Sequence, residues 1–188
     1  MADQYIDEFV PPQERVEIME QYVREAVNDP VVRELAFKFA AENPSNPAQG
    51  ILDGQSRIIK YELDCGSGTC EILRTARDTI TRGTGDCKKK SIVTAAMLRI
   101  VGIPSIVVWL DQESKGFSNN HVAVQACRVG MPRHGADTAV QVYLPENATE
   151  CNGGWVWVET TLPGARVGAD PYQEFQRLKG NTGNREIL

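Results

Sequence analysis

Apolar residues recur at helical spacing through the first half of the chain. In residues 13–42 they share one face of a helix that breaks before Pro30, a residue suited to the first turn of a second helix. The same spacing predicts further helices over residues 48–63 and 71–81, with a loop at 64–70 between them. The N-terminal half is therefore predicted to be helical.

The second half of the chain follows the period of two that is typical of strands. After a helix from Cys87 to Gly102, four short segments rich in β-branched and aromatic residues are predicted as strands: residues 105–110, 121–126, 139–144 and 155–159. Helices followed by an antiparallel sheet predict the α+β class, with N-terminal helices packed on the sheet. We expect one domain, in which an arm and helices (1–47) precede a core (48–180) and a polar tail (181–188).

Composition and charge argue against several classes of function. The chain is 41% hydrophobic and 24% charged, which is ordinary for a globular domain, and its net charge of −5 predicts no nucleic-acid partner. The N-terminal sequence lacks the features of a signal peptide and no apolar run is long enough to span a bilayer, so a cytoplasmic protein without a membrane partner is expected. The five cysteines are then expected to be mostly thiols, with Cys127 and Cys151 as packing residues.

Cys87 is the strongest candidate for a nucleophile. It follows the glycine turn Gly83-Thr84-Gly85, begins a predicted helix, and has Asp86 as a predicted N-cap before it. Free backbone N–H groups and the helix dipole favour a thiolate at such a position. The same N–H groups can stabilise an oxyanion, and glycine allows a substrate to approach.

Three lysines follow the cysteine directly, Lys88 to Lys90. Positive charge opposes the helix dipole at this end, so the run is not chosen to stabilise the helix. One interpretation is a solvated, charged turn. The other is a cationic rim that binds an acidic substrate or favours the thiolate.

A base and an orienting acid can be assigned from the strands. Of the two histidines, His121 begins a strand, whereas His134 lies in a turn typical of the surface. Glu159 ends the strand that contains Trp155 and Trp157, and a carboxylate beside tryptophans needs a partner such as an imidazole. The alternatives are a surface acid at the strand end and, for the tryptophans, core packing in place of a substrate wall.

The chain contains, in order, the segment Gly83 to Cys87, a helix ending in Gly102-Ile103-Pro104, a histidine on a strand, and a Trp-rich strand ending in an acid. This ordered set resembles the core motif of papain-like, transglutaminase-like cysteine enzymes. Tyr61 to Cys87 also resembles small transglutaminase-like proteins of tailed phages. The family usually has acids where this chain has Lys88 to Lys90, and Asp-Pro-Thr where it has Glu159-Thr160-Thr161.

The resemblance implies acyl transfer on amide bonds through a thioester, as in a protease, amidase or transglutaminase, without a cofactor or metal. It assigns Cys87, His121 and Glu159 as the catalytic triad. Gly85, Asp86, Lys88 and Trp157 are the candidate substrate-binding residues, and the partner is a peptide or another amide. The alternative is an inactive structural or binding protein of a larger assembly, for example in a phage virion.

Two further questions stay open from the sequence. Cys65 and Cys70 have four residues between them, a spacing that allows a zinc pair or a disulfide, although free loop thiols are the simpler interpretation. Tyr61 and Gln55 are both candidates for a second oxyanion donor, and the sequence does not choose between them.

Overall fold

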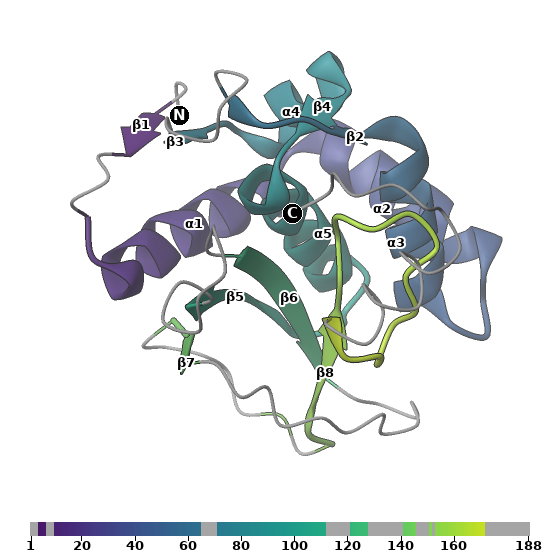
Figure 1. Ribbon diagram of the computed structural model, residues 1–188. Coiled ribbons are helices and arrows are strands. Elements are labelled where there is room, and N and C mark those ends of the chain that lie inside the picture. Colours follow the sequence, from purple (N-terminus) through teal and green to yellow (C-terminus); the bar gives the residue numbers. More distant parts are fainter. Residues whose placement is uncertain are drawn as a thin grey trace, which may run out of the picture.

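The computed structural model describes residues 4–6, 10–64, 71–111, 121–127, 141–145, 151 and 153–171. In chain order the elements are β1 (Gln4–Ile6), α1 (Pro12–Ala26), α2 (Pro30–Glu42), α3 (Pro47–Ile58), β2 (Lys60–Tyr61), β3 (Glu71–Leu73), α4 (Ala76–Arg82), β4 (Thr84–Gly85), α5 (Cys87–Ile100), β5 (Ser105–Asp111), β6 (His121–Cys127), β7 (Gln141–Tyr143) and β8 (Trp155–Val158). Within these ranges no helix is long and apolar enough to cross a membrane. The predicted α+β class is confirmed, with helices on one side of an antiparallel sheet (Figure 1).

The helix boundaries follow from local capping. α1, α2 and α3 each carry proline in the first turn, where its missing N–H costs nothing. Asp29 caps α2 by accepting hydrogen bonds from the backbone N–H groups of Val31 and Val32, so the predicted break before Pro30 is confirmed. Gly102, with a φ of 82°, ends α5 as predicted.

Two predicted helices are shorter than expected because strand pairing replaces their ends. α3 stops at Ile58, and residues 60–61 form β2, which pairs in parallel with β4. Residues 71–73 form β3, paired with β1, so that α4 begins only at Ala76. The predicted turn around Gly85 includes β4. These pairings are long-range contacts, which a local hydrophobic period does not reveal.

The main sheet has the strand order β7-β5-β6-β8, with antiparallel neighbours throughout. Its strands confirm the four predicted from the sequence, within one residue at each described end, and residues 139–140 of the third prediction lie outside the described residues. β6 begins at His121 opposite Leu110 of β5 and ends at Cys127 opposite Trp155 of β8. The sheet therefore places the first residue of β6 near the last residues of β8.

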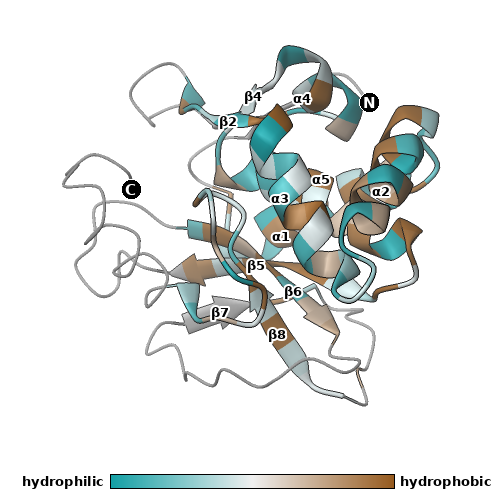
Figure 2. Cartoon of the chain, turned by 90° about the vertical axis from the view of Figure 1, so that its right-hand side faces the viewer, coloured by the Kyte–Doolittle hydropathy of each residue, from teal (hydrophilic) through white to brown (hydrophobic). Residues whose placement is uncertain are grey.

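Helix α5 lies at the centre of the fold. It packs against α1, α2, α3 and α4 as well as β5 and β6, and every residue from Cys87 to Leu98 is buried. Figure 1 shows it in the middle of the helices, and Figure 2, turned by 90°, shows the helices together on one side of the sheet. The larger apolar cluster fills the space between helices and sheet. A second, smaller cluster on the sheet comprises Ile106, Val108, Leu110, Ala123 and Trp157.

Two glycines allow α3 to approach α2 closely. A Cβ on Gly54 would lie 2.2 Å from the ring of Phe39, and one on Gly50 would lie 2.4 Å from the Phe39 carbonyl oxygen. The chain after β8 then runs back beside α3 (Figure 1), where Gln49 donates to the Ala165 carbonyl and accepts from the Val167 N–H. α3 thus contacts α2 through its glycines and the segment after β8 through Gln49.

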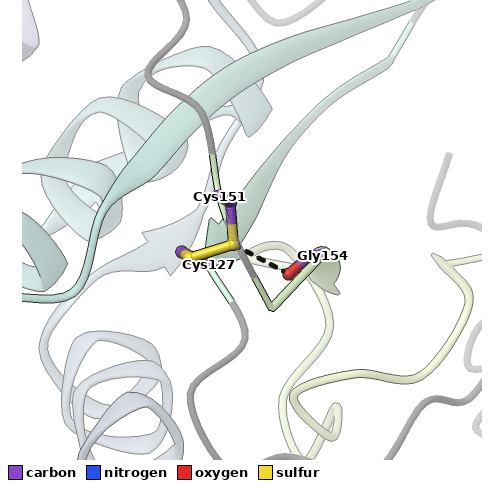
Figure 3. The surroundings of a disulfide bond; sticks show 3 residues. All are labelled: Cys127, Cys151 and Gly154. Atoms are coloured by element: carbon purple, nitrogen blue, oxygen red, sulfur yellow. Dashed lines mark hydrogen bonds between the residues drawn. A yellow bond between two sulfur atoms is a disulfide. The ribbon is translucent and has the colours of Figure 1, made fainter.

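Cys127 and Cys151 form a disulfide, so the prediction that they are packing thiols is wrong. Figure 3 shows the bond beside Gly154, with a Cα–Cα distance of 5.5 Å. The bond joins the end of β6 to the residues just before β8 and closes a loop with a sequence separation of 24. Such a crosslink typically contributes about 2–4 kcal/mol by restricting the unfolded chain. The two cysteines meet because Cys127 of β6 pairs with Trp155 of β8. Sequence spacing does not reveal this pairing, so the prediction failed.

Candidate active site

Cys87 is the first residue of α5 and the one free cysteine among the described residues. The Asp86 side chain caps the helix as predicted, accepting a hydrogen bond from the Lys89 N–H at 3.2 Å. The Asp86 carbonyl accepts from the Lys90 N–H at 3.0 Å. The Cys87 N–H has no partner in the described part of the chain, so it remains available to a ligand. The thiol is buried, with a residue exposure of 7%.

His121 and Glu159 form a buried ion pair beside Cys87. The His121 Nε2 atom lies 2.7 Å from Glu159 Oε2. The other carboxylate oxygen of Glu159 accepts hydrogen bonds from the backbone N–H of Thr161 at 2.8 Å and from its hydroxyl at 2.5 Å. Because Glu159 occupies Nε2, Nδ1 is the ring nitrogen left for Cys87, which hydrogen-bonds to the imidazole.

His121 and Glu159 each stabilise the charged form of the other. Burial alone would lower the pKa of His121, but the Glu159 carboxylate and the hydrogen bonds with Cys87 and Glu159 raise the pKa to about 10. Burial alone would raise the pKa of Glu159, but the His121 charge and the hydrogen bonds from His121 and Thr161 lower it. The pair therefore favours an imidazolium next to a carboxylate.

Ser91 ties together the three segments that carry these residues. It lies one helical turn after Cys87, is fully buried, and donates to the Val122 carbonyl at 3.2 Å. Its oxygen also lies 3.1 Å from the Thr160 hydroxyl. Val122 and Thr160 directly follow His121 and Glu159 in sequence. The helix is thus hydrogen-bonded to the neighbour of each residue of the ion pair.

The lysine run is buried, so the interpretation as a solvated turn is wrong. The residue exposures of Lys88, Lys89 and Lys90 are 9%, 0% and 2%. The run lies inside because α5 is central to the fold. The ammonium group of Lys90 donates to the Ile59 carbonyl at 2.7 Å, and burial lowers its pKa to about 8, against the opposing effect of Glu159.

The other two lysines belong to a second buried cluster of charge, which we call the anchoring cluster (Asp64, Arg74, Asp86, Lys88 and Lys89). Lys89 lies 2.5 Å from Asp64 and 3.3 Å from Asp86, and Lys88 lies 2.8 Å from Asp86. Arg74 lies 3.7 Å from Asp64, which also accepts from the Ile72 N–H at 2.9 Å. Burial would raise the pKa of Asp86, but the two lysines lower it. The cluster fixes residues 64 and 72–74 to the start of α5.

The structure brings the predicted site residues to different places. Cys87, His121 and Glu159 meet at the start of α5. A Cβ on Gly85 would lie 2.9 Å from the Cβ of Lys89, so close approach of the chain to α5 already requires glycine there. Trp157 is buried in the smaller apolar cluster, as core packing predicts. Substrate contacts by Gly85, Asp86, Lys88 and Trp157 stay predictions.

Four candidates from the sequence remain: His134, the Cys65–Cys70 segment, Gln55 and Tyr61. His134 and the Cys65–Cys70 segment lie outside the described residues. Across the described ranges, no three His, Cys, Asp or Glu side chains gather as a metal site would require. Gln55 is fully buried and its amide nitrogen has no hydrogen-bond partner there. Tyr61 lies close enough for the charges of Cys87 and Glu159 to act on it. Its strand pairing with Gly85 is the feature that a local pattern could not reveal.

Residues 33–166, more than half of the chain, match the family described as the transglutaminase-like superfamily. No curated protein matches the sequence. Among solved structures, the chain is similar to a protein from Cytophaga hutchinsonii whose assignment as a cysteine protease is itself provisional, with 16% identity and a TM-score of 0.43. That match covers 78% of this chain and 39% of the other, so this chain spans well under half the length of that protein.

Proposed function

Because the chain belongs to the transglutaminase-like superfamily, we propose that it is a cysteine-dependent enzyme that transfers acyl groups from amide bonds. The observation that carries the proposal is the junction of Cys87, at the start of α5, with the His121–Glu159 ion pair at 2.7 Å. A thiol at a helix N-terminus and beside an imidazole is poised to become a thiolate. Glu159 holds the imidazole in position by its second nitrogen.

The reaction follows from these positions. The Cys87 thiolate attacks the amide carbonyl carbon, a sulfur–carbon bond forms, and the carbonyl electron pair moves to oxygen. The oxyanion lies near the free Cys87 N–H, which can donate to it. As the carbon–nitrogen bond breaks, the His121 imidazolium gives its proton to the departing amine. Water or an amine then attacks the thioester, His121 accepts the proton, and the thiolate leaves.

The substrate is proposed to be a peptide or another amide. Asp86 and Lys88 neutralise each other in the anchoring cluster at 2.8 Å, which weighs against a free cationic rim for an acidic substrate. A substrate approaching Cys87 therefore meets mainly the backbone of the turn at Gly85. Recognition through backbone groups suits an extended peptide.

The first test is the rate at which iodoacetamide alkylates Cys87 between about pH 5 and 9, measured by mass spectrometry with free glutathione as reference. We expect fast alkylation below about pH 7, where an ordinary thiol reacts slowly. His121→Ala and Glu159→Gln should slow it, whereas Cys87→Ser should remove it. An alkylation profile like that of glutathione, unchanged in both variants, would overturn the proposal and favour the inactive structural or binding protein.

A further inference from the structure

Tyr61 lies on the inward side of β2, beside the turn that leads to Cys87. The parallel pairing of β2 with β4 places Tyr61 opposite Gly85, and the next residue, Glu62, donates its N–H to the Gly85 carbonyl at 3.2 Å. Lys60 is exposed, whereas Tyr61 is half-buried and packs against the apolar cluster that includes Cys87. The strand pairing therefore fixes the ring next to the candidate site.

The Tyr61 side chain is half-buried, and its hydroxyl makes no hydrogen bond to another described residue, so it remains able to donate to a ligand. Burial, followed by negative charge on Cys87 and Asp86, raises its pKa above the ordinary value, and Glu159 adds to the effect. The Tyr61 side chain therefore lies within electrostatic range of both the nucleophile and the acid of the site. A phenol in this state stays protonated at neutral pH and can donate a hydrogen bond.

We propose that Tyr61 is a further catalytic residue, whose hydroxyl donates a hydrogen bond to the oxyanion formed when Cys87 attacks a carbonyl. The inference rests on the function proposed above. When the sulfur–carbon bond forms, the negative charge moves from sulfur to the carbonyl oxygen, and Tyr61 keeps its proton throughout. The Cys87 N–H is the second donor, so the oxyanion is held between a backbone group and a side chain.

A role at the oxyanion differs from a role at the thiolate. Among the described residues, the Cys87 side chain hydrogen-bonds to His121 and not to Tyr61. A donor that acts on the oxyanion only is most effective when charge has left the sulfur, and so accelerates acyl transfer without changing the thiolate. Two reactions of the same cysteine can therefore separate these roles.

The experiment compares Tyr61→Phe with the unmodified chain toward two probes. Acylation by p-nitrophenyl acetate passes through an oxyanion, and the release of p-nitrophenolate measures it. Alkylation by iodoacetamide displaces iodide from a saturated carbon and forms no oxyanion. Cys87→Ala supplies the background rate, and Tyr22→Phe, in the core of α1, is the matched control for the loss of a buried hydroxyl.

We expect Tyr61→Phe to slow acylation about 10-fold or more, since an oxyanion donor is worth about 10²–10³ in rate on a full substrate. Its alkylation rate and its midpoint of thermal unfolding should match those of the unmodified chain, and Tyr22→Phe should change neither rate. Equal loss of both reactions, or no loss of acylation, would overturn the role of Tyr61. If the unmodified chain itself reacts with iodoacetamide only as glutathione does at about pH 6, the proposed function fails first and the Tyr61 role with it.

Discussion

Two buried clusters of charge meet at the start of α5, and they respond differently to the loss of a partner. The His121–Glu159 pair contains an imidazole, which can release its proton near neutral pH when its carboxylate is removed. The anchoring cluster contains lysines, an arginine and aspartates, and no imidazole. The first cluster is therefore suited to moving protons, and the second to holding the chain in place.

The largest effect on stability is expected from Lys89→Met. This change leaves Asp64 and Asp86 without the ammonium that lies between them, and breaking a buried pair from one side costs about 3–5 kcal/mol. Urea unfolding measures the loss. Adding Asp64→Asn to Lys89→Met should restore part of it, because this removes a buried carboxylate charge that has lost its closest cation. A double variant no more stable than Lys89→Met would contradict the pairing.

Glu159→Gln should lower the free energy of unfolding less than Lys89→Met does, but it should lower the reactivity of Cys87 more. The amide keeps the shape and can still accept from Thr161, and His121 can discharge, so the expected loss is about 1.5–3 kcal/mol, typical of a hydrogen bond to a charged group. Cys87 alkylation below about pH 7 should fall strongly, because the imidazolium loses its partner. Lys89→Met is the matched comparison. For each variant, the loss of Cys87 alkylation rate is divided by the loss in free energy of unfolding, and this ratio should be higher for Glu159→Gln than for Lys89→Met. A higher ratio for Lys89→Met would contradict the distinction between the two clusters.

The dependence of stability on pH should combine two opposite contributions. The His121 pKa of about 10 lies above its ordinary 6.5, so its stabilisation is complete below about pH 6.5 and is lost as the pH rises toward 10. The Lys90 pKa of about 8 lies below its ordinary 10.5, so the folded state loses that proton first and gains relative stability from about pH 8 to 10.5.

Chemical denaturation at a series of pH values separates these contributions. Lys90→Met should make the decline above pH 8 steeper, whereas Glu159→Gln should flatten the decline between about pH 6.5 and 8. Identical pH profiles for Lys90→Met and the unmodified chain would show that Lys90 does not titrate in this range.

The smallest effect is expected from Ser91→Ala. Loss of the hydrogen bonds to Val122 and Thr160 should cost about 1 kcal/mol, because both partners are buried and left with one bond fewer. Alkylation of Cys87 should slow modestly if the helix then sits less firmly against β6. Ser105→Ala is the control, because it removes a buried hydroxyl that donates to the Ala95 carbonyl. Equal changes in alkylation rate for the two variants would contradict a positioning role for Ser91.

The sequence predicted the fold class and the meeting of Cys87, His121 and Glu159 because those rest on local period and on the order of motifs. It did not predict that Lys89 would be buried, because a run of three lysines has the composition of a surface and its partner Asp64 lies 25 residues upstream. The Cys127–Cys151 disulfide and the place of Tyr61 depend on strand register and on parallel pairing. Both arise from contacts between distant segments, which a pattern read along one chain does not contain.

The burial of the three lysines also affects how the protein meets a protease. Trypsin cleaves after lysine, and residues 88–90 offer it three consecutive bonds, all within the first turn of a helix surrounded by other elements. Those bonds become accessible only when α5 separates from its neighbours, which requires nearly global unfolding. Cleavage at this run would therefore report the population of the unfolded chain, and a molecule that keeps it intact also keeps Cys87 attached to the helix that begins with it.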